Sequence, residues 1–312
     1  MSEHAAATLA PQLAELGVEP VVLAGQVDDI EVAWGSADLF RDRQLTRKFF
    51  GAVTHSTTLQ WMQFSGSGTD DPVFRNLMEK GVTVTTSHVA GPPIADYTMR
   101  AVLDWFQRAE KWRAAQRERR WVQHEFREIL GTTWLVIGMG SIGLEVAVRA
   151  RAFGAKVIGV RRTPRGDEPV DEIITPDQVL DVLPRADVVV LAVPAIGSTS
   201  ELVDEKFLGL MRPSSVLVNV SRGSLVDEPA LLAALDRGAP EVALLDVCAV
   251  EPLPDDSPLW THPGVVLTAH SSGLGLDRHD RAAAFFIENL TRYLKAETLR
   301  NVVTREEAFG ES

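Results

Sequence analysis

An α/β fold of two domains, each built on a parallel sheet, is predicted by three features of the sequence. Residues 134–143 read as a buried strand, a glycine-rich turn and the start of a helix. From Thr133 onwards, apolar runs alternate regularly with amphipathic stretches, which is typical of a doubly wound parallel sheet. The length of 312 residues is also long for a single core and comfortable for two domains.

The division between the domains is expected at Gly91-Pro92-Pro93, a sequence that breaks regular structure. We expect one domain from residues 1–95 together with 278–312, and a dinucleotide-binding domain from residues 96–277. The last amphipathic helix, expected at residues 278–295, and the tail at 298–303 return to the first domain.

The first domain is expected to be a small α/β unit, because short strands and helices alternate throughout it. Its helices are predicted at residues 5–16, 37–48 and 76–80, and its strands at 18–23, 30–34, 58–64 and 82–86. No opening strand is evident before residues 5–16. We therefore expect a domain that is trimmed or differently wound at its start.

A long helical stretch is expected at residues 94–119, where apolar residues recur at helical spacing. It is rich in arginine, and Trp105, Trp112 and Trp121 are interleaved with the charges. This pattern allows either a nucleic-acid patch or a solvated helix face whose tryptophans pack against a neighbour. The formal net charge of −12 favours the solvated face. We expect a protruding helical arm that helps to form a homodimer.

The second domain is expected to hold a doubly wound parallel sheet of about six strands. Strands are predicted at residues 135–137, 156–160, 188–192, 216–220, 242–246 and 265–268. Helices are predicted between them at residues 144–153, 176–183, 204–210 and 229–237. The link at residues 250–263 is rich in proline and should be poor in helix.

The composition is that of a soluble globular protein, with 45% hydrophobic and 24% charged residues. No apolar run approaches the roughly 20 residues of a membrane helix, and the start of the chain does not read as a signal peptide. Cys248 is the single cysteine and fits a reducing cytoplasm. We expect a cytoplasmic protein that binds neither nucleic acid nor membrane, and we see no metal-ligand pattern.

The glycine-rich turn carries the pattern Gly-x-Gly-x-x-Gly at Gly138, Gly140 and Gly143. The first glycine permits the tight turn, the second lets backbone approach a pyrophosphate, and the third lets helix pack close to strand. The helix start, which includes Ser141 and Ile142, offers unpaired N–H groups to phosphates. With a strand before it and a helix after it, the pattern indicates a dinucleotide site. The alternative is a glycine-rich turn in an ordinary βαβ unit.

Two arginines, Arg161 and Arg162, follow the second strand where an NAD site usually has an acidic residue. A guanidinium pairs with a 2′-phosphate, whereas a carboxylate would repel it. The sequence therefore predicts NADP in preference to NAD. In the alternative interpretation, one or both arginines point to solvent and Asp167 or Glu168 reaches back to the ribose.

Residues that could take part in catalysis follow three strands that we expect to be neighbours. Ligands of open α/β sheets bind at these carboxyl ends of the strands. Arg222 follows the fourth strand, Asp246 and Glu251 the fifth, and His270 the sixth. Imidazole titrates near neutrality, so His270 suits a proton donor to a carbonyl, with Glu251 holding the ring. Arg222 suits a substrate carboxylate and carbonyl. Taken singly, each residue could instead be structural.

These residues resemble the D-isomer-specific 2-hydroxyacid dehydrogenase family. The similarity covers most of the chain and is carried by residues 218–228, 245–254 and 267–270, together with the glycine turn. It implies two Rossmann-like domains with an active-site cleft between them. It also implies Arg222 as the substrate anchor, His270 as the general acid with Glu251 as its partner, and Asp246 near the nicotinamide amide.

The resemblance further implies that residues 59–70 form a substrate loop, with backbone amides at Ser67 and Gly68 holding the carboxylate. The arginine pair resembles the NADP-linked glyoxylate/hydroxypyruvate reductase branch. There are departures, since Ala269 replaces a usual proline and residues 274–276 lack a usual aromatic residue.

The resulting hypothesis is an oxidoreductase that reduces a small 2-keto acid to a D-2-hydroxy acid. Two alternatives stay open at this point. One is a cofactor-sensing, corepressor-like interaction protein of the same fold. The other is a two-domain dehydrogenase of the formate or phosphite type.

Overall fold

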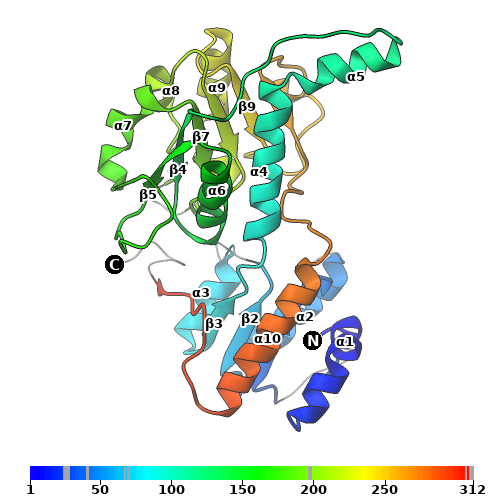
Figure 1. The fold of residues 1–312 in the computed structure, drawn as a ribbon. Helices are drawn as coiled ribbons and strands as arrows, with labels where there is room; N and C mark the ends of the chain where they lie inside the picture. Colours follow the sequence, from blue (N-terminus) through cyan, green and yellow to red (C-terminus); the bar gives the residue numbers. More distant parts are fainter. Residues whose placement is uncertain are drawn as a thin grey trace. The chain divides into compact units, whose positions relative to one another are not determined.

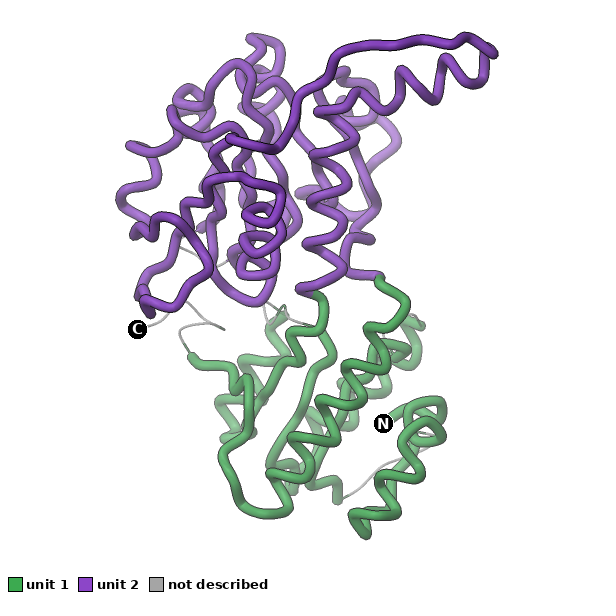
Figure 2. The backbone as a smooth tube through the Cα atoms, in the orientation of Figure 1, with its two compact units in different colours: residues 1–90, 275–312 green, residues 91–274 purple. Residues whose placement is uncertain are grey.

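A computed structural model describes residues 1–23, 29–39, 42–66, 68, 71–195, 199–305 and 308 of the protein. The chain forms two compact units (Figure 2). Unit 1 comprises residues 1–90 and 275–312, and unit 2 comprises residues 91–274. The divisions expected after residues 95 and 277 lie a few residues beyond these. Within the described residues, no helix is long and apolar enough to cross a membrane.

Unit 2 is organised around a seven-stranded parallel sheet with the order β10-β9-β8-β7-β4-β5-β6. Its strands are β4 (Thr133–Ile137), β5 (Lys156–Val160), β6 (Glu172–Ile174), β7 (Val188–Leu191), β8 (Val216–Asn219), β9 (Val242–Leu245) and β10 (Val265–Leu267). All six predicted strands are confirmed. The sequence did not indicate β6, because three residues that begin with a charged one are too short for a periodic signal.

Helices lie on both faces of this sheet (Figure 1). They are α4 (Gly91–Phe106), α5 (Ala109–Arg117), α6 (Ser141–Ala152), α7 (Val179–Val182), α8 (Glu205–Leu210) and α9 (Glu228–Asp236). Strands β7, β8 and β9 are buried along their whole length, as expected for parallel strands covered on both faces. The proline-rich link contains the short 3₁₀ turn η5 (Pro258–Trp260) and is otherwise irregular, as predicted.

The predicted single helix at residues 94–119 is wrong in one respect, since it is broken into α4 and α5. Arg108 adopts a left-handed backbone with φ of 50°, which ends the first helix. The arginines of this region pair with acids, as in Arg113–Asp104 and Arg117–Glu110. These pairs fit a solvated helix face.

The tryptophans of this region differ in burial. Trp112 stacks on His124 with ring centroids 4.5 Å apart, so this ring packs as predicted. Trp121 follows α5 and is 95% exposed in the single chain, so its predicted packing against a neighbour does not occur within this chain. Figure 1 shows that α5 and the chain after it extend away from the sheet of unit 2.

Unit 1 contains a three-stranded parallel sheet with the order β1-β2-β3 among the described residues. Its strands are β1 (Val32–Gly35), β2 (Trp61–Phe64) and β3 (Thr83–Thr86). Its helices are α1 (Glu3–Glu15), α2 (Arg43–His55), α3 (Pro72–Glu79) and α10 (Arg278–Leu294). The tail returns to this unit as predicted, because the Val303 amide donates to the Val84 carbonyl of β3.

Two predictions for unit 1 are wrong. Residues 18–23 form no regular strand, since Pro20 lacks an amide and the backbone bonds of this segment include two to Met1. The helix expected at residues 37–48 starts later, at Arg43, because the Asp42 carboxylate caps it by accepting from the amides of Gln44 and Leu45.

Candidate active site

The glycine turn between β4 and α6 has the geometry that the sequence predicted. Gly138 has φ of +102°, and a Cβ there would lie 2.5 Å from the Ala192 carbonyl oxygen. A Cβ on Gly143 would lie 1.8 Å from the Gly138 carbonyl oxygen. Both positions therefore require glycine, and α6 packs directly against the end of β4.

The start of α6 fits a dinucleotide phosphate. Gly140 is the N-cap residue, and it has no side chain that could accept from the first amides of the helix. The first amides of the helix are thus left for an anion, where the helix dipole also favours negative charge. The predicted residues that would hold a dinucleotide here are Gly138, Gly140, Ser141, Ile142 and Gly143.

The two arginines after β5 have different surroundings. Arg161 donates from Nη1 to the Met139 carbonyl at 2.8 Å, so it braces the glycine turn. Its Nε lies 3.8 Å from Glu168, which does reach back towards it. The Glu168 carboxylate accepts hydrogen bonds from backbone amides, and these bonds lower its pKa. The bond from the Arg165 amide has the largest effect. Arg162 is exposed at the surface.

His270 and Glu251 meet as the sequence predicted. The Nδ1 atom of His270 lies 2.7 Å from Oε2 of Glu251, and both side chains are partly exposed. The other carboxylate oxygen of Glu251 accepts from the Cys248 amide at 3.1 Å, which fixes its position. A carboxylate bonded to Nδ1 selects the tautomer and leaves Nε2 to face a ligand.

The loop that carries His270 is held by Asp246, which is 1% exposed. Its Oδ1 accepts from the Thr268 hydroxyl at 2.6 Å and the Ser271 amide at 2.9 Å, and its Oδ2 accepts from the Ser272 amide. Its carbonyl accepts from the His270 amide at 2.7 Å. His270 itself has a left-handed backbone with φ of 47°, and these bonds hold it there.

Tyr97 on α4 completes this arrangement, and the sequence did not indicate it. Its hydroxyl lies 2.7 Å from the Thr268 hydroxyl oxygen. Burial raises the pKa of Tyr97, which keeps its hydroxyl neutral. The two residues are 171 positions apart in the chain, so no local pattern could have joined them. Thr268, by contrast, lies within the histidine motif.

Arg222 follows β8 on a loop with its own support. The Asn219 side chain donates to the Arg222 carbonyl and accepts from the Ser221 amide. The Arg222 guanidinium is partly buried and donates from Nη1 to the Ser221 carbonyl at 2.8 Å. The neighbouring Gly223 contacts the backbone of Cys248, so the arginine and glutamate loops are packed together.

The remaining predicted site residues belong to unit 1. Ser67 lies outside the described residues, and Gly68 is partly buried in the loop that follows β2. Among the residues that the structure describes, no group of three or more His, Cys, Asp or Glu side chains could hold a metal ion.

Residues 99–272 match a family model described as "D-isomer specific 2-hydroxyacid dehydrogenase, NAD binding domain". The chain therefore belongs to the D-isomer-specific 2-hydroxyacid dehydrogenase family. This match confirms the predicted family and an NAD-binding domain, and the parallel sheets described above confirm the predicted α/β fold.

Several relatives agree with this assignment. Glyoxylate reductase of Korarchaeum cryptofilum is 31% identical over 252 residues, which cover 77% of this chain and 74% of the relative. D-3-phosphoglycerate dehydrogenase of Methanocaldococcus jannaschii is 29% identical over 91% of this chain. The matched part is only 57% of that relative, so the chain spans little more than half its length.

A solved structure extends the comparison to the fold. A D-isomer specific 2-hydroxyacid dehydrogenase from Xanthobacter autotrophicus Py2, in complex with NADPH and MES, superposes with a TM-score of 0.73. It is 27% identical, and the match covers 90% of this chain and 86% of that chain.

Proposed function

We propose that the protein reduces a small 2-keto acid to a D-2-hydroxy acid with NADPH. The observation that carries the proposal is the 2.7 Å contact between His270 and Glu251, on loops after adjacent strands of an NAD-binding domain. A histidine whose Nδ1 is held by a carboxylate can present Nε2 to a reacting oxygen. The name of the glyoxylate reductase relative supports a substrate as small as glyoxylate.

Each residue of the proposed site has a distinct role. The bound cofactor supplies the hydride. His270 donates a proton from Nε2 to the carbonyl oxygen of the substrate, while Glu251 stabilises the protonated ring. Arg222 anchors the substrate carboxylate and polarises its carbonyl. Ser67 and Gly68 are proposed to hold the same carboxylate through their amides.

The cofactor preference is part of the proposal. Arg162 is exposed after β5, where its guanidinium suits the 2′-phosphate of NADP, and Arg161 braces the glycine turn beside it. Binding of NADPH by the relative from Xanthobacter autotrophicus supports this choice. Asp246 is proposed to lie near the nicotinamide amide while it holds the histidine loop. A cytoplasmic homodimer completes the proposal.

The direct test is whether the protein consumes NADPH when glyoxylate, hydroxypyruvate or phenylpyruvate is added. The consumption is monitored as a loss of NADPH absorbance. Replacing His270 by Ala should lower kcat by about 10² to 10⁴-fold, because general acid catalysis contributes that much. NADPH binding, measured by fluorescence, should persist in the variant. Chiral analysis of the phenylpyruvate product should give the D isomer.

A matched control is available in the same unit. His262 also lies beside a carboxylate, 3.3 Å from Asp236, but away from the histidine motif. The His262→Gln variant should retain turnover. If the parent protein turned over none of the three acids, this result would instead favour the corepressor-like alternative or the formate- and phosphite-type alternative. Unchanged kcat in His270→Ala would remove His270 from the mechanism.

A further inference from the structure

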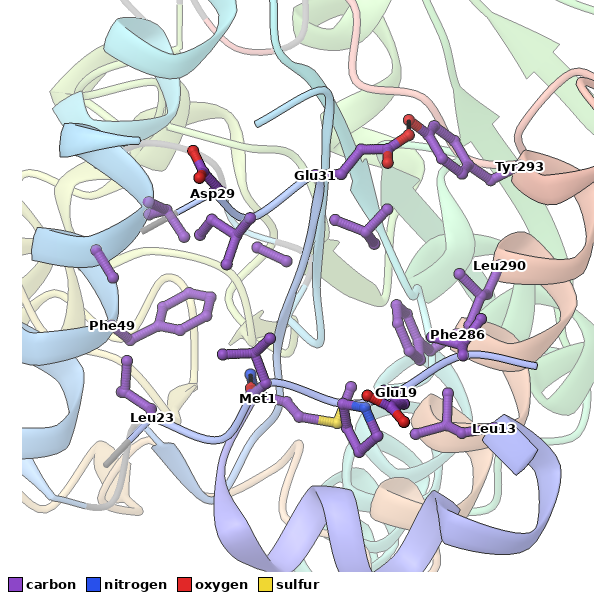
Figure 3. A pocket seen from close by; sticks show the side chains of 18 of the residues that line it. Met1, Leu13, Glu19, Leu23, Asp29, Glu31, Phe49, Phe286, Leu290 and Tyr293 are labelled. Carbon is purple, nitrogen blue, oxygen red and sulfur yellow. Dashed lines mark hydrogen bonds between the residues drawn. The ribbon is translucent and has the colours of Figure 1, made fainter. Parts of the chain in front are cut away.

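Unit 1 contains a pocket of ≈ 300 Å³ whose walls are mostly apolar, with side chains such as Leu13, Phe49 and Phe286 (Figure 3). Glu31, which also lines it, accepts from the Tyr293 hydroxyl at 2.7 Å, so this charge is satisfied within the chain. Apolar walls alone do not select a particular ligand. A buried charge with a definite set of partners is more informative, and the loop after β5 in unit 2 contains one.

The carboxylate of Glu168 is folded under the loop that follows β5. Its side chain is 2% exposed, whereas Arg165, Gly166 and Asp167 beside it are all exposed. One carboxylate oxygen accepts from the Arg165 amide at 2.8 Å, and the other accepts from the Gly166 amide at 2.9 Å. Burying a carboxylate is costly unless donors of this kind surround it. Glu168 therefore closes the chain at residues 165–168 into a compact turn.

Arg161 connects this turn to the glycine turn. Its Nε lies 3.8 Å from Oε1 of Glu168, and its Nη1 donates to the Met139 carbonyl at 2.8 Å. Met139 stands between Gly138 and Gly140, where the pyrophosphate of a dinucleotide is predicted to bind. One guanidinium thus bridges the glycine turn and the loop after β5.

Backbone hydrogen bonds hold the two ends of this loop. The Arg161 amide donates to the carbonyl of Ile174, the last residue of β6, at 3.0 Å. The Val170 amide donates to the Glu168 carbonyl at 2.8 Å. With its ends held, the loop depends on the Glu168 carboxylate for the conformation of its middle part. In sheets of this type, the loop after the second strand lies beside the adenosine ribose of the dinucleotide.

Glu168 has two opposite effects on a phosphate bound at this loop. Hydrogen bonds from the backbone, above all from the Arg165 amide, lower the pKa of its carboxyl, so it is ionised at neutral pH and repels a phosphate. The same carboxylate holds the loop whose neighbour Arg162 is proposed to pair with the 2′-phosphate. The nearby Arg161 guanidinium and the two amides offset much of the negative charge, which leaves the effect on loop shape as the larger one.

We propose that Glu168 is a positioning residue that favours NADPH, because it holds the loop after β5 against Arg161 and so places Arg162 for the 2′-phosphate. This inference rests on the proposed function, since it takes NADPH as the cofactor. Its consequence is specific. An acidic residue promotes binding of the more negative cofactor, which is the reverse of what its charge alone predicts.

The test measures the Kd of NADPH and of NADH by fluorescence in two variants of the full chain. Glu168→Gln keeps the length of the side chain but has a single acceptor oxygen, and Glu168→Asp keeps the charge but is one methylene too short. Both should raise the Kd of NADPH at least ~10-fold, the effect expected when a charge-assisted bond to the 2′-phosphate is lost. Both should leave the Kd of NADH within about 2-fold, because NADH makes no such bond.

Asp167→Asn is the matched control, since Asp167 is the adjacent carboxylate but is exposed. This variant removes the same charge from the loop and should leave the Kd of NADPH unchanged or lower it by at most about 2-fold, because solvent and salt screen an exposed charge. The three variants therefore separate the shape of the loop from its charge.

Three results would overturn the proposal. The first is unchanged or tighter binding of NADPH by the Glu168 variants, which would show that charge alone matters. The second is an equal rise in the Kd of NADPH and of NADH, which would make Glu168 a general support of the glycine turn or a ribose ligand. The third is a parent protein that binds NADH as tightly as NADPH. All of these are binding measurements, so a lack of keto-acid turnover would overturn the proposed reduction without changing them.

Discussion

Gly223 lies against Cys248 so closely that a Cβ on Gly223 would be 1.9 Å from the Cys248 carbonyl carbon. This contact joins the loop of Arg222 to the loop of Glu251. Glu228 reinforces it by accepting from the Ala249 amide at 2.7 Å. The spacing of the arginine and glutamate groups thus depends on a position that tolerates no side chain.

Replacing Gly223 by Ala should therefore lower kcat/KM for the 2-keto acid by at least ~10²-fold, because the loops must separate by an ångström or more. The measurement is steady-state reduction with NADPH. Gly209→Ala in α8 is the control, since a Cβ there meets nothing within 4 Å. If Gly223→Ala kept full activity, the packing of these loops would not set the site.

Tyr97→Phe should disturb the histidine loop without touching the reactants. The variant removes the bond to Thr268 and leaves that hydroxyl bonded to Asp246. Losing one hydrogen bond of about 1 kcal/mol should let the strained backbone of His270 relax part of the time. We expect kcat to fall about 3- to 10-fold with little change in the Kd of NADPH. An unaltered kcat would show that Asp246 holds the loop alone.

Much of unit 2 could be predicted because buried parallel strands are short apolar runs with sharp ends. The same reasoning placed Arg222, Glu251 and His270 after strands that prove to be neighbours in the sheet. It could not find Tyr97, because the contact to Thr268 joins distant parts of the chain. It also missed the break at Arg108, since nothing in that residue type marks a left-handed backbone.

Unit 1 was predicted less well for a related physical reason. Residues 18–23 have the apolar character of a strand but belong to no strand pair among the residues that the structure describes. Strand formation depends on pairing as much as on residue type, so a local pattern alone overstates it. Helix α2 likewise begins later than its apolar pattern indicates, because Asp42 caps it.

Variants at Arg162 and Arg165 should distinguish recognition of the cofactor from a general effect of surface charge. Arg162→Ala should raise KM for NADPH at least ~10-fold and leave KM for NADH nearly unchanged, because the lost guanidinium is the group proposed to pair with the 2′-phosphate. Arg165→Ala is the control, since this side chain is also exposed but comes later in the chain after β5. Equal effects of Arg162→Ala on both cofactors would contradict the assignment.

Cys248 reports on the charge around the glutamate loop. Burial, followed by the negative charges of Glu228, Glu251 and Asp246, raises the pKa of its thiol to about 11. Because the thiolate is the nucleophile, alkylation by iodoacetamide should increase about 10-fold per pH unit up to roughly pH 10. The protein unfolded in guanidinium is the control and should level off near the ordinary cysteine pKa, ~8.5. A plateau at that pH in the folded protein would contradict the raised pKa.

The segment after α5 is proposed to form the dimer contact, because Trp121 is 95% exposed and the nearby Phe126 is 47% exposed. Exposed aromatic groups on a projecting arm are typical of protein interfaces. Trp121→Ser should shift the sedimentation coefficient from dimer to monomer and weaken association at least ~10-fold, since a central tryptophan often contributes over 1 kcal/mol. Leu276→Ser is the matched control, because Leu276 is 94% exposed but belongs to unit 1. A parent protein that sediments as a monomer, or equal effects of the two variants, would place the association surface elsewhere.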